Sequence, residues 1–382
     1  MNIVQLKKMQ YDEVAKCTRC GFCLPNCPTY AVKRSERYTA RGRNAITRAL
    51  IEGRLDPSDE MATSVFTCLG CGACTAACFP AVKTKGAVMD DRALMVTEGH
   101  QPAIMHKLVE SLNEYHNITE DDNEERGDWK ELLKDVPEEH LDKETAEVAY
   151  FVGCVASFFP MAQKIPAGFA EIMYKAGLDF TVLGGEEWCC GFPLIGAGEP
   201  ERLEEMKVHN LEKVRATGAK TVVFACPSCY HTWKHFYNVE GIELLHASQL
   251  MAKLVTEGKL ELKPVNLKVT YHDPCDLGRN SGVYDEPRQV INAIPGLEFV
   301  ELPNNRNLSV CCGGGGNVEM VDPELSQAIA QMKIEEIQST GAQAVVSSCQ
   351  QCLRTIATRA RRAGADVTVM DLTQLVKQSL AG

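Results

Sequence analysis

From Val148 onward, short apolar runs alternate with longer amphipathic segments. The apolar runs end at cysteines, as in VAYFVGC, KTVVFAC, LKVTYHDPC and AQAVVSSC. The segments between them, such as residues 200–218 and 322–341, repeat their apolar residues at helical spacing. Strands that alternate with helices are typical of α/β units with a largely parallel sheet, whose sites form at the carboxyl ends of the strands. We therefore expect the cysteines at that edge.

The first 148 residues have a different pattern. Residues 1–100 hold two cysteine runs among short helical patterns, of which Ala40 to Glu52 is the clearest. Residues 101–148 hold helical pieces and the strongly acidic stretches TEDDNEER and VPEEHLDKETAE. This composition predicts a solvated connector or partner surface, with no catalytic pair of carboxylates.

The second part of the chain is an internal duplication of residues 149–265 and 266–382. The same arrangement of five cysteines occurs twice, at an offset of 121 to 123 residues. Such a small drift is what loop insertions allow in a repeated unit. The equivalent pairs are Cys154 and Cys275, Cys189 and Cys311, Cys190 and Cys312, Cys226 and Cys349, and Cys229 and Cys352.

Composition and charge narrow the function classes. The formal net charge of −11 leaves no basic stripe for nucleic acid. The N-terminal residues lack the apolar core of a signal peptide, and no apolar run approaches the roughly 18 residues of a membrane helix. We expect a cytoplasmic protein that meets a membrane only through a partner. In a reducing compartment, 18 cysteines indicate metal ligation and not a disulfide framework.

Eight cysteines form two runs with the spacing of two-cluster bacterial ferredoxins. In such runs three thiolates hold one cubane [4Fe–4S] cluster, and the fourth cysteine reaches the other cluster. Tetrahedral zinc is the alternative, and this spacing, occurring twice, disfavours it. Arg41 and Arg43, between the runs, either offset cluster charge or lie on a solvated helix face. The predicted sets are Cys17, Cys20, Cys23 and Cys78 for one cluster, and Cys68, Cys71, Cys74 and Cys27 for the other.

Each repeat offers one cysteine, then an adjacent Cys-Cys-Gly, then Cys-x-x-Cys. The side chains of two adjacent cysteines diverge, which suits a larger and less regular cluster than a cube. The glycines that follow allow close approach of the backbone and turn N–H groups toward sulfur. Gly313–Gly316 lacks the spacing of a phosphate-binding or dinucleotide-binding loop, so we expect no nucleotide here.

This pattern resembles the cysteine-rich, or CCG, domain of heterodisulfide reductase catalytic subunits. It also resembles the iron–sulfur subunits of glycolate and lactate oxidases and of anaerobic glycerol-3-phosphate dehydrogenase. The order of two ferredoxin motifs and two CCG repeats spans nearly the whole sequence, and TARGR at 39–43 is similar to a segment of the glycolate oxidase subunits. The resemblance implies one non-cubane [4Fe–4S] cluster on the five cysteines of each repeat: Cys154, Cys189, Cys190, Cys226 and Cys229, and Cys275, Cys311, Cys312, Cys349 and Cys352.

The expected fold class is α/β. A mainly helical ferredoxin-type domain (1–100) and the acidic helical connector (101–148) precede two duplicated CCG units with largely parallel sheets (149–265 and 266–382). Many glycolate oxidase subunits lack one of the final cysteines of a repeat. Both repeats are complete here, which favours two loaded sites and leans toward the heterodisulfide reductase type.

Two functions fit these features. In the first, an iron–sulfur subunit takes electrons from an FAD-containing dehydrogenase of a 2-hydroxy acid such as lactate or glycolate, or from another flavoprotein. It then passes them to a membrane quinone, a cytochrome or another carrier. In the second, the paired non-cubane clusters face each other across a cleft and reduce a disulfide, and Cys190 and Cys312 are the candidates for the catalytic role. A structural zinc protein conflicts with the ferredoxin spacing.

Some neighbours of the cysteines are candidates for supporting roles. His231 and His235 lie four residues apart after Cys-x-x-Cys, which suits packing or a hydrogen bond near the cluster better than a zinc finger. The pair His272-Asp273 is expected either to orient the loop of Cys275 or to cap a turn. Trp188 is expected to shield a cluster by packing.

Overall fold

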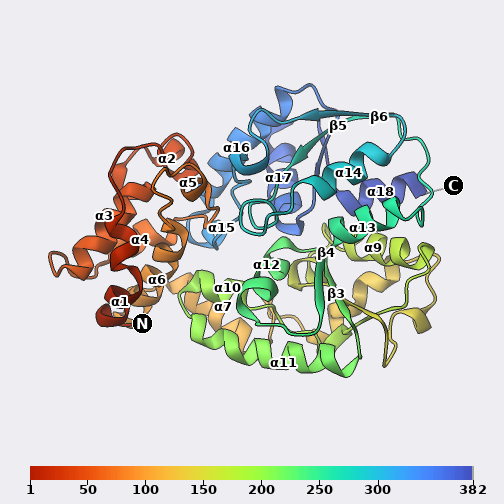
Figure 1. Ribbon diagram of the computed structural model, residues 1–382, viewed down its shortest axis with the longest axis horizontal. Coiled ribbons are helices and arrows are strands. Elements are labelled where there is room, and N and C mark those ends of the chain that lie inside the picture. The colour runs from red at the N-terminus through yellow and green to blue at the C-terminus, as the bar shows by residue number, and fades with distance from the viewer. Residues whose placement is uncertain (381–382) are drawn as a thin grey trace.

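The computed structural model describes residues 1–380 of the 382-residue chain. A helical N-terminal domain lies beside two α/β lobes, which face each other (Figure 1). The helix predicted over residues 40–52 is present as α3, and it begins where the Thr39 hydroxyl accepts a hydrogen bond from the Gly42 amide at 3.0 Å. The helices of this domain are α1 (Ile3–Ala15), α2 (Pro28–Lys33), α3 (Ala40–Ile51), α4 (Asp59–Phe66), α5 (Ala73–Ala76) and α6 (Thr84–Thr97).

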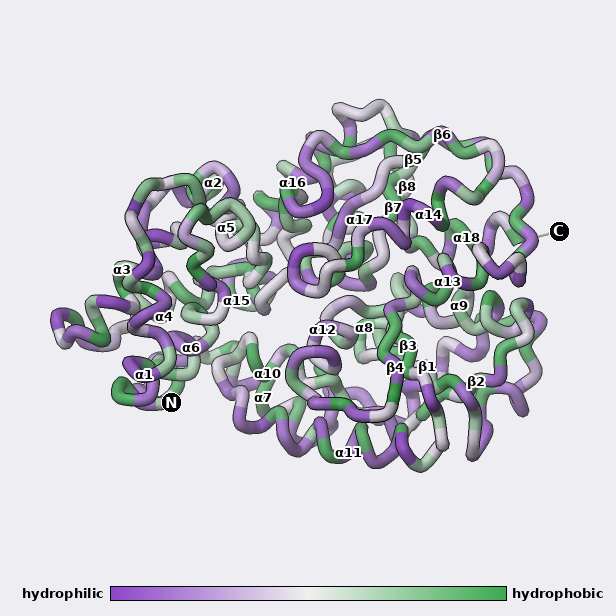
Figure 2. The backbone as a smooth tube through the Cα atoms, viewed as in Figure 1, coloured by the Kyte–Doolittle hydropathy of each residue, from purple (hydrophilic) through white to green (hydrophobic). Residues whose placement is uncertain are grey.

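The first lobe contains a four-stranded parallel sheet of order β2-β1-β3-β4. Its amphipathic helix α11 covers residues 203–216 of the segment predicted to be helical, and hydrophobic and hydrophilic residues alternate along it (Figure 2). The strands are β1 (Val148–Phe151), β2 (Phe180–Val182), β3 (Thr221–Phe224) and β4 (Glu243–His246). The helices are α8 (Cys154–Phe158), α9 (Lys164–Lys175), α10 (Phe192–Ala197), α11 (Leu203–Ala216), α12 (Pro227–Phe236) and α13 (Ala247–Thr256).

The second lobe repeats this plan with a parallel sheet of order β6-β5-β7-β8. Because the sheet order and the helix positions match, the duplication in sequence is a duplication in structure. The strands are β5 (Leu267–His272), β6 (Leu297–Glu301), β7 (Ala344–Ser347) and β8 (Thr368–Asp371). The helices are α14 (Asp285–Ala293), α15 (Val318–Val321), α16 (Pro323–Gln338), α17 (Gln350–Ala363) and α18 (Leu372–Leu380).

The two lobes pack through equivalent helices. Helix α9 of the first lobe contacts α18 of the second, and α14 of the second contacts α13 of the first. One apolar core runs through both lobes, with Phe169, Leu250, Ile291 and Val376 among its buried residues. This reciprocal contact holds the carboxyl ends of the two sheets in fixed relation.

Most residues of the two acidic stretches are exposed or half-buried, and other parts of residues 101–148 pack against both lobes. Helix α7 (Ala103–Glu114) contacts α10 and α15, and the 3-10 segment η2 (Asn123–Leu132) contacts α8 and α9. Trp129 is 1% exposed and Arg126 is 2% exposed. The burial of these two residues could not be predicted from the composition, because the residues around them are charged. Among residues 1–380, no helix is both long enough and apolar enough to cross a membrane.

Candidate iron–sulfur centres

The eight N-terminal cysteines line two adjacent cavities. The structure brings together the members of each predicted set, and Cys74 borders both cavities. Cys20 is exposed, so the outer cavity lies near the surface, whereas Cys27 and Cys71 of the inner cavity are buried. The outer cavity is lined by Cys17, Cys20, Cys23 and Cys78, and the inner cavity by Cys27, Cys68, Cys71 and Cys74.

The inner cavity contains a buried positive charge. Arg43 is 2% exposed and donates from Nε to the Ser64 carbonyl at 3.0 Å, while its Nη2 has no partner among the described residues. Burial raises the pKa of Cys27, and the charge of Arg43 opposes that rise. Arg43 therefore does not lie on a solvated face. Arg41 is part-exposed and forms an ion pair with Glu36.

The glycine loop of the second lobe lies against the second ferredoxin run. A Cβ atom on Gly315 would lie 2.6 Å from the Leu69 carbonyl oxygen, and one on Gly316 would lie 2.5 Å from that of Cys68. Arg279 donates from Nε to the Cys71 carbonyl at 2.9 Å. Glycine is required here because the two backbones approach closely, which places the inner cavity beside the cysteines of the second lobe.

Arg92 of α6 joins all three parts of the molecule. Its Nη1 donates to Gly196 of the first lobe at 2.7 Å and to Gly316 of the second at 3.0 Å. Its Nε and Nη2 donate to the carbonyls of Val65, Phe66 and Cys68 at 3.0, 3.3 and 2.6 Å. Burial lowers the pKa of Arg92 to about 10, so the guanidinium stays charged at neutral pH. Sequence reasoning missed this residue, because nothing in the periodicity of α6 marks it.

All ten cysteines of the two repeats line one cavity of about 390 Å³ between the lobes. Three of them begin or cap a helix after a strand: Cys154 begins α8 after β1, and Cys226 and Cys349 are the N-cap residues of α12 and α17. Gly313 has φ of +101°, and a Cβ there would lie 2.5 Å from the Ser326 carbonyl oxygen. The glycine after Cys-Cys is therefore needed for the turn.

The thiols of each repeat influence one another's pKa in the same order. Neighbouring thiols shift the pKa along the series Cys154, Cys189, Cys190, Cys229 and Cys226, and along the series Cys275, Cys311, Cys312, Cys352 and Cys349. Hydrogen bonds from the thiols on either side lower the pKa of the middle cysteine, Cys190 in one repeat and Cys312 in the other. Two equivalent clusters of five soft sulfur donors therefore face one cavity.

Polar groups of the second lobe also line this cavity. The Arg354 guanidinium lies 3.8 Å from the centre of the Phe159 ring. Its Nη1 donates to the Gln351 side chain at 2.8 Å, and its Nη2 lies 3.7 Å from a carboxylate oxygen of Glu319. The cavity is therefore lined mainly by apolar side chains and cysteines, with Arg354 as a charged group beside them.

A charged donor from outside the first repeat contacts the first cysteine of that repeat, and sequence reasoning missed it. Arg126 of η2 lies 3.3 Å from Cys154 Sγ through Nη2 and forms a buried ion pair with Glu187 at 3.0 Å. The Glu187 carboxylate also accepts from the amides of Val152 and Gly153, at 2.7 and 2.8 Å. This network holds the loop between β1 and Cys154. No spacing in the acidic segment marks Arg126.

The other candidates occupy supporting positions. His231 lies 3.3 Å from Lys85 Nζ, and His235 lies 3.1 Å from the Asn280 carbonyl oxygen. Trp188 stacks between the rings of His116 and His209 at 3.4 and 3.7 Å. None of these three side chains lines a cysteine cavity that the structure describes.

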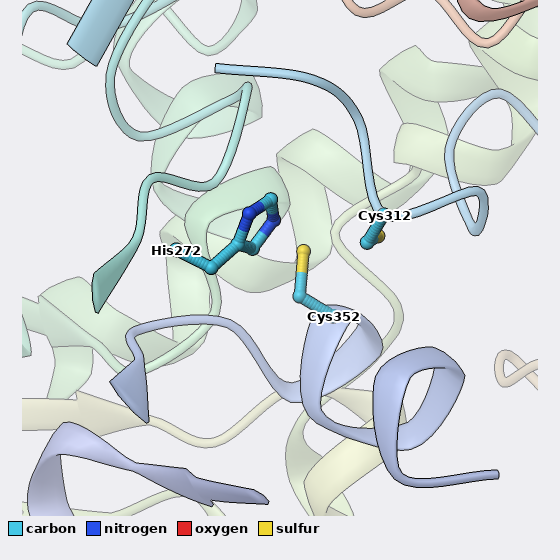
Figure 3. A group of neighbouring side chains, drawn as sticks. All are labelled: His272, Cys312 and Cys352. Carbon is cyan, nitrogen blue, oxygen red and sulfur yellow. The ribbon is translucent and has the colours of Figure 1, made fainter. Parts of the chain in front are cut away.

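Asp273 orients the loop before Cys275. Its carboxylate accepts two hydrogen bonds from Arg288, at 2.8 and 2.9 Å, and one from the Arg306 amide at 2.7 Å. Its neighbour His272 faces Cys312 and Cys352 (Figure 3). The pair therefore does more than cap a turn, since Asp273 connects the loop to α14.

Comparison with known proteins agrees with this architecture. A 4Fe-4S dicluster domain matches residues 13–82, and a cysteine-rich domain (CCG) matches residues 148–234 and 269–357. One subunit of the dihydromethanophenazine:CoB--CoM heterodisulfide reductase of Methanosarcina barkeri is 31% identical, over 98% of this chain and 96% of that one. The chain belongs to the family of this heterodisulfide reductase subunit. The predicted order of ferredoxin motifs and CCG repeats is thereby confirmed, as is the α/β fold class.

More distant relatives of this heterodisulfide reductase family member share nearly all of the chain. One subunit of the fumarate reductase (CoM/CoB) of Methanothermobacter marburgensis is 28% identical over 98% of this chain and 74% of its own length. EtfAB:quinone oxidoreductase of Syntrophomonas wolfei is 26% identical over 96% of this chain and 58% of its own length. The chain is accordingly an iron–sulfur electron-transfer subunit of an oxidoreductase complex.

Proposed function

We propose that this subunit holds four [4Fe–4S] clusters and reduces a disulfide in the cavity between its two CCG lobes. The observation that carries the proposal is that all ten CCG cysteines line that one cavity, of about 390 Å³. An electron carrier needs neighbouring centres only. A cavity bordered by both sets of ligands also gives a substrate access to them.

The donor sets fit these groups. Thiolate sulfur is the ligand that iron–sulfur clusters take from proteins, and the outer and inner cavities each offer four cysteines at ferredoxin spacing. We assign Cys17, Cys20, Cys23 and Cys78 to one cubane cluster, and Cys27, Cys68, Cys71 and Cys74 to the other. The unpaired Nη2 of Arg43 supports a negative group in the inner cavity. In the two repeats, five contacting thiols per lobe support a non-cubane cluster.

The order of the cavities supports transfer of electrons from the surface to the interior. The outer and inner cavities share Cys74, and the Cys71 backbone contacts Arg279 of the second lobe. Clusters bound along this line would supply one electron at a time. The exposed Cys20 marks the end at which a partner protein, in our proposal a flavoprotein, delivers electrons.

The reaction at the cavity balances as one disulfide, two electrons and two protons giving two thiols. The electrons come from the partner flavoprotein and the protons from solvent, which reaches the cavity. The chain's own residues would bind the substrate: Arg354, which lines the cavity beside Phe159 of the first lobe, offers N–H donors. The soft sulfur donors hold the disulfide-reducing centres in place.

A second candidate function is electron transfer alone, from a flavoprotein to a quinone or another carrier. The similarity to EtfAB:quinone oxidoreductase favours it. In this version the cavity has no substrate. Lactate or glycolate as the source of the electrons stays a prediction, as does membrane association through a partner.

One experiment separates the two functions. The isolated reduced protein should cleave a mixed thiol disulfide, and Cys190→Ser or Cys312→Ser should abolish cleavage while the ferredoxin-type electron paramagnetic resonance (EPR) signals survive. Met320→Leu, a volume-conserving change at the rim of the cavity, is the matched control and should retain cleavage. An isolated protein that leaves disulfides intact, and reduces dye only when its flavoprotein is added, would establish the second function instead.

A further inference from the structure

We propose that His272 donates a hydrogen bond to the cluster of the second repeat and raises the reduction potential of that cluster. This rests on the proposed function, since it requires a cluster on the second-repeat cysteines. His272 ends β5 and is 1% exposed. A ring nitrogen and the Sγ atoms of Cys312 and Cys352 all lie within 4.8 Å of one another (Figure 3).

The imidazole of His272 needs a hydrogen-bond partner that the rest of the chain does not provide. Neither Nδ1 nor Nε2 has one among residues 1–380. An imidazole carries at least one N–H in either tautomer, and a buried donor without an acceptor destabilises the folded state. The sulfurs of Cys312 and Cys352 lie within 4.8 Å of a ring nitrogen. A cluster bound to these two residues supplies the acceptor.

The first repeat has no such donor at the equivalent position. His272 pairs with Ser347 across the sheet, and its counterpart Phe151 pairs with Phe224. The Phe151 ring packs against Phe224 and Trp233, with ring centres 5.6 and 5.4 Å apart. A phenyl ring donates no hydrogen bond, so the two CCG sites differ at this point although their cysteines match.

The difference acts on the redox chemistry. A hydrogen bond to a cluster sulfur or a coordinating thiolate stabilises the reduced state, which carries one more negative charge. In the first repeat, Arg126 donates to the sulfur of a different cysteine, Cys154. His272 acts at Cys312 and Cys352, the counterparts of Cys190 and Cys229, and so its effect is confined to the second-repeat cluster.

The test is a redox titration of the anaerobically reconstituted protein, followed by EPR. Measuring it in the Cys190→Ser, Cys229→Ser background isolates the second-repeat signal. His272→Phe should lower the reduction equilibrium constant of that cluster about tenfold, which is about 59 mV for a one-electron couple. The iron content should stay unchanged. An unchanged potential, or loss of about four irons, would overturn the proposal, because the second result makes His272 a ligand.

Further variants keep the test decisive. Phe151→His in the otherwise unchanged protein should raise the potential of the first-repeat cluster and leave the second alone. His272→Gln or His272→Asn keeps an N–H donor, and at least one should recover part of the potential that His272→Phe loses. If the unsubstituted protein has only ferredoxin-type signals and about eight irons, the proposed function fails as well. If it has both CCG signals but His272→Phe does not move the potential, only this inference fails.

Discussion

Replacing Arg92 by methionine should lower the stability of the folded protein, because this one side chain connects the ferredoxin domain to both lobes. Its guanidinium is fully buried and donates to five backbone carbonyls, and among residues 1–380 it has no carboxylate partner. Two of these carbonyls, at Gly196 and Gly316, belong to different lobes. Methionine keeps much of the volume and removes every donor.

The size of the effect follows from these contacts. A hydrogen bond from a charged group contributes about 1.5–3 kcal/mol, and five bonds from one group are not additive. Removing the guanidinium also removes the cost of burying its charge, which is reflected in a pKa lowered to about 10. We therefore expect a net loss of about 3 kcal/mol. If the loss falls on unfolding, cluster absorbance should disappear in denaturant about 100-fold faster.

The assay is anaerobic unfolding of the reconstituted protein in guanidinium, followed at the cluster absorbance band. Arg48→Met is the matched control, because the Arg48 side chain is 37% exposed and forms its ion pair with Glu52, the C-cap residue of the same helix. An exposed pair of this kind contributes less than about 1 kcal/mol. If Arg92→Met unfolds at the rate of Arg48→Met, the account of Arg92 as the junction is refuted.

Three other predictions concern single residues. Cys78→Ser should perturb the EPR signal of the outer-cavity cluster more than that of the inner; the reverse would mean that each run binds its own cluster. Arg126→Met leaves the Glu187 carboxylate buried and unpaired, so thermal unfolding should show a loss of about 3–5 kcal/mol, which adding Glu187→Gln should partly restore; no loss would refute the buried pair. Burial raises the pKa of Asp91 to about 7, above its unfolded value of about 3.9. The folded chain therefore keeps a proton that the unfolded chain has lost, so stability falls as pH rises from about 4 to 7; urea unfolding of Asp91→Asn should lack this fall, and an unchanged slope would contradict the cause.

Strands β1, β3, β5 and β7 and the position of the cysteines after them could be predicted, because the apolar runs of these strands end at cysteines. The ferredoxin spacing also assigned Cys27 to the cluster of the second run, and in the structure Cys27 lines the inner cavity together with the cysteines of that run. What could not be predicted depends on contacts between distant segments. Arg92 and Arg126 lie in stretches whose local pattern is that of a surface helix and an acidic loop, and only the packed chain buries them.

The shape of the shared cavity likewise depends on contacts between distant segments of the chain. Each repeat predicts its own five cysteines, and the disulfide-reducing hypothesis has the two sets face each other across a cleft, but neither repeat shows which surfaces bring the sets together. That follows from the reciprocal contacts of α9 with α18 and of α13 with α14, which are apolar pairings without a sequence motif. The asymmetry between His272 and Phe151 is visible in the aligned repeats. The role proposed for His272 depends on the structure, which places a ring nitrogen of His272 within 4.8 Å of the sulfurs of Cys312 and Cys352.

The account depends most on the loading of both CCG repeats, and iron analysis measures this directly. The protein should be reconstituted anaerobically and its iron, acid-labile sulfide and zinc determined per chain. Four clusters of four irons predict about sixteen irons and no stoichiometric zinc, and substitution of Cys190 and Cys229 by serine should remove about four irons. Eight or fewer irons per chain, or zinc bound to the repeats, would contradict the central claim.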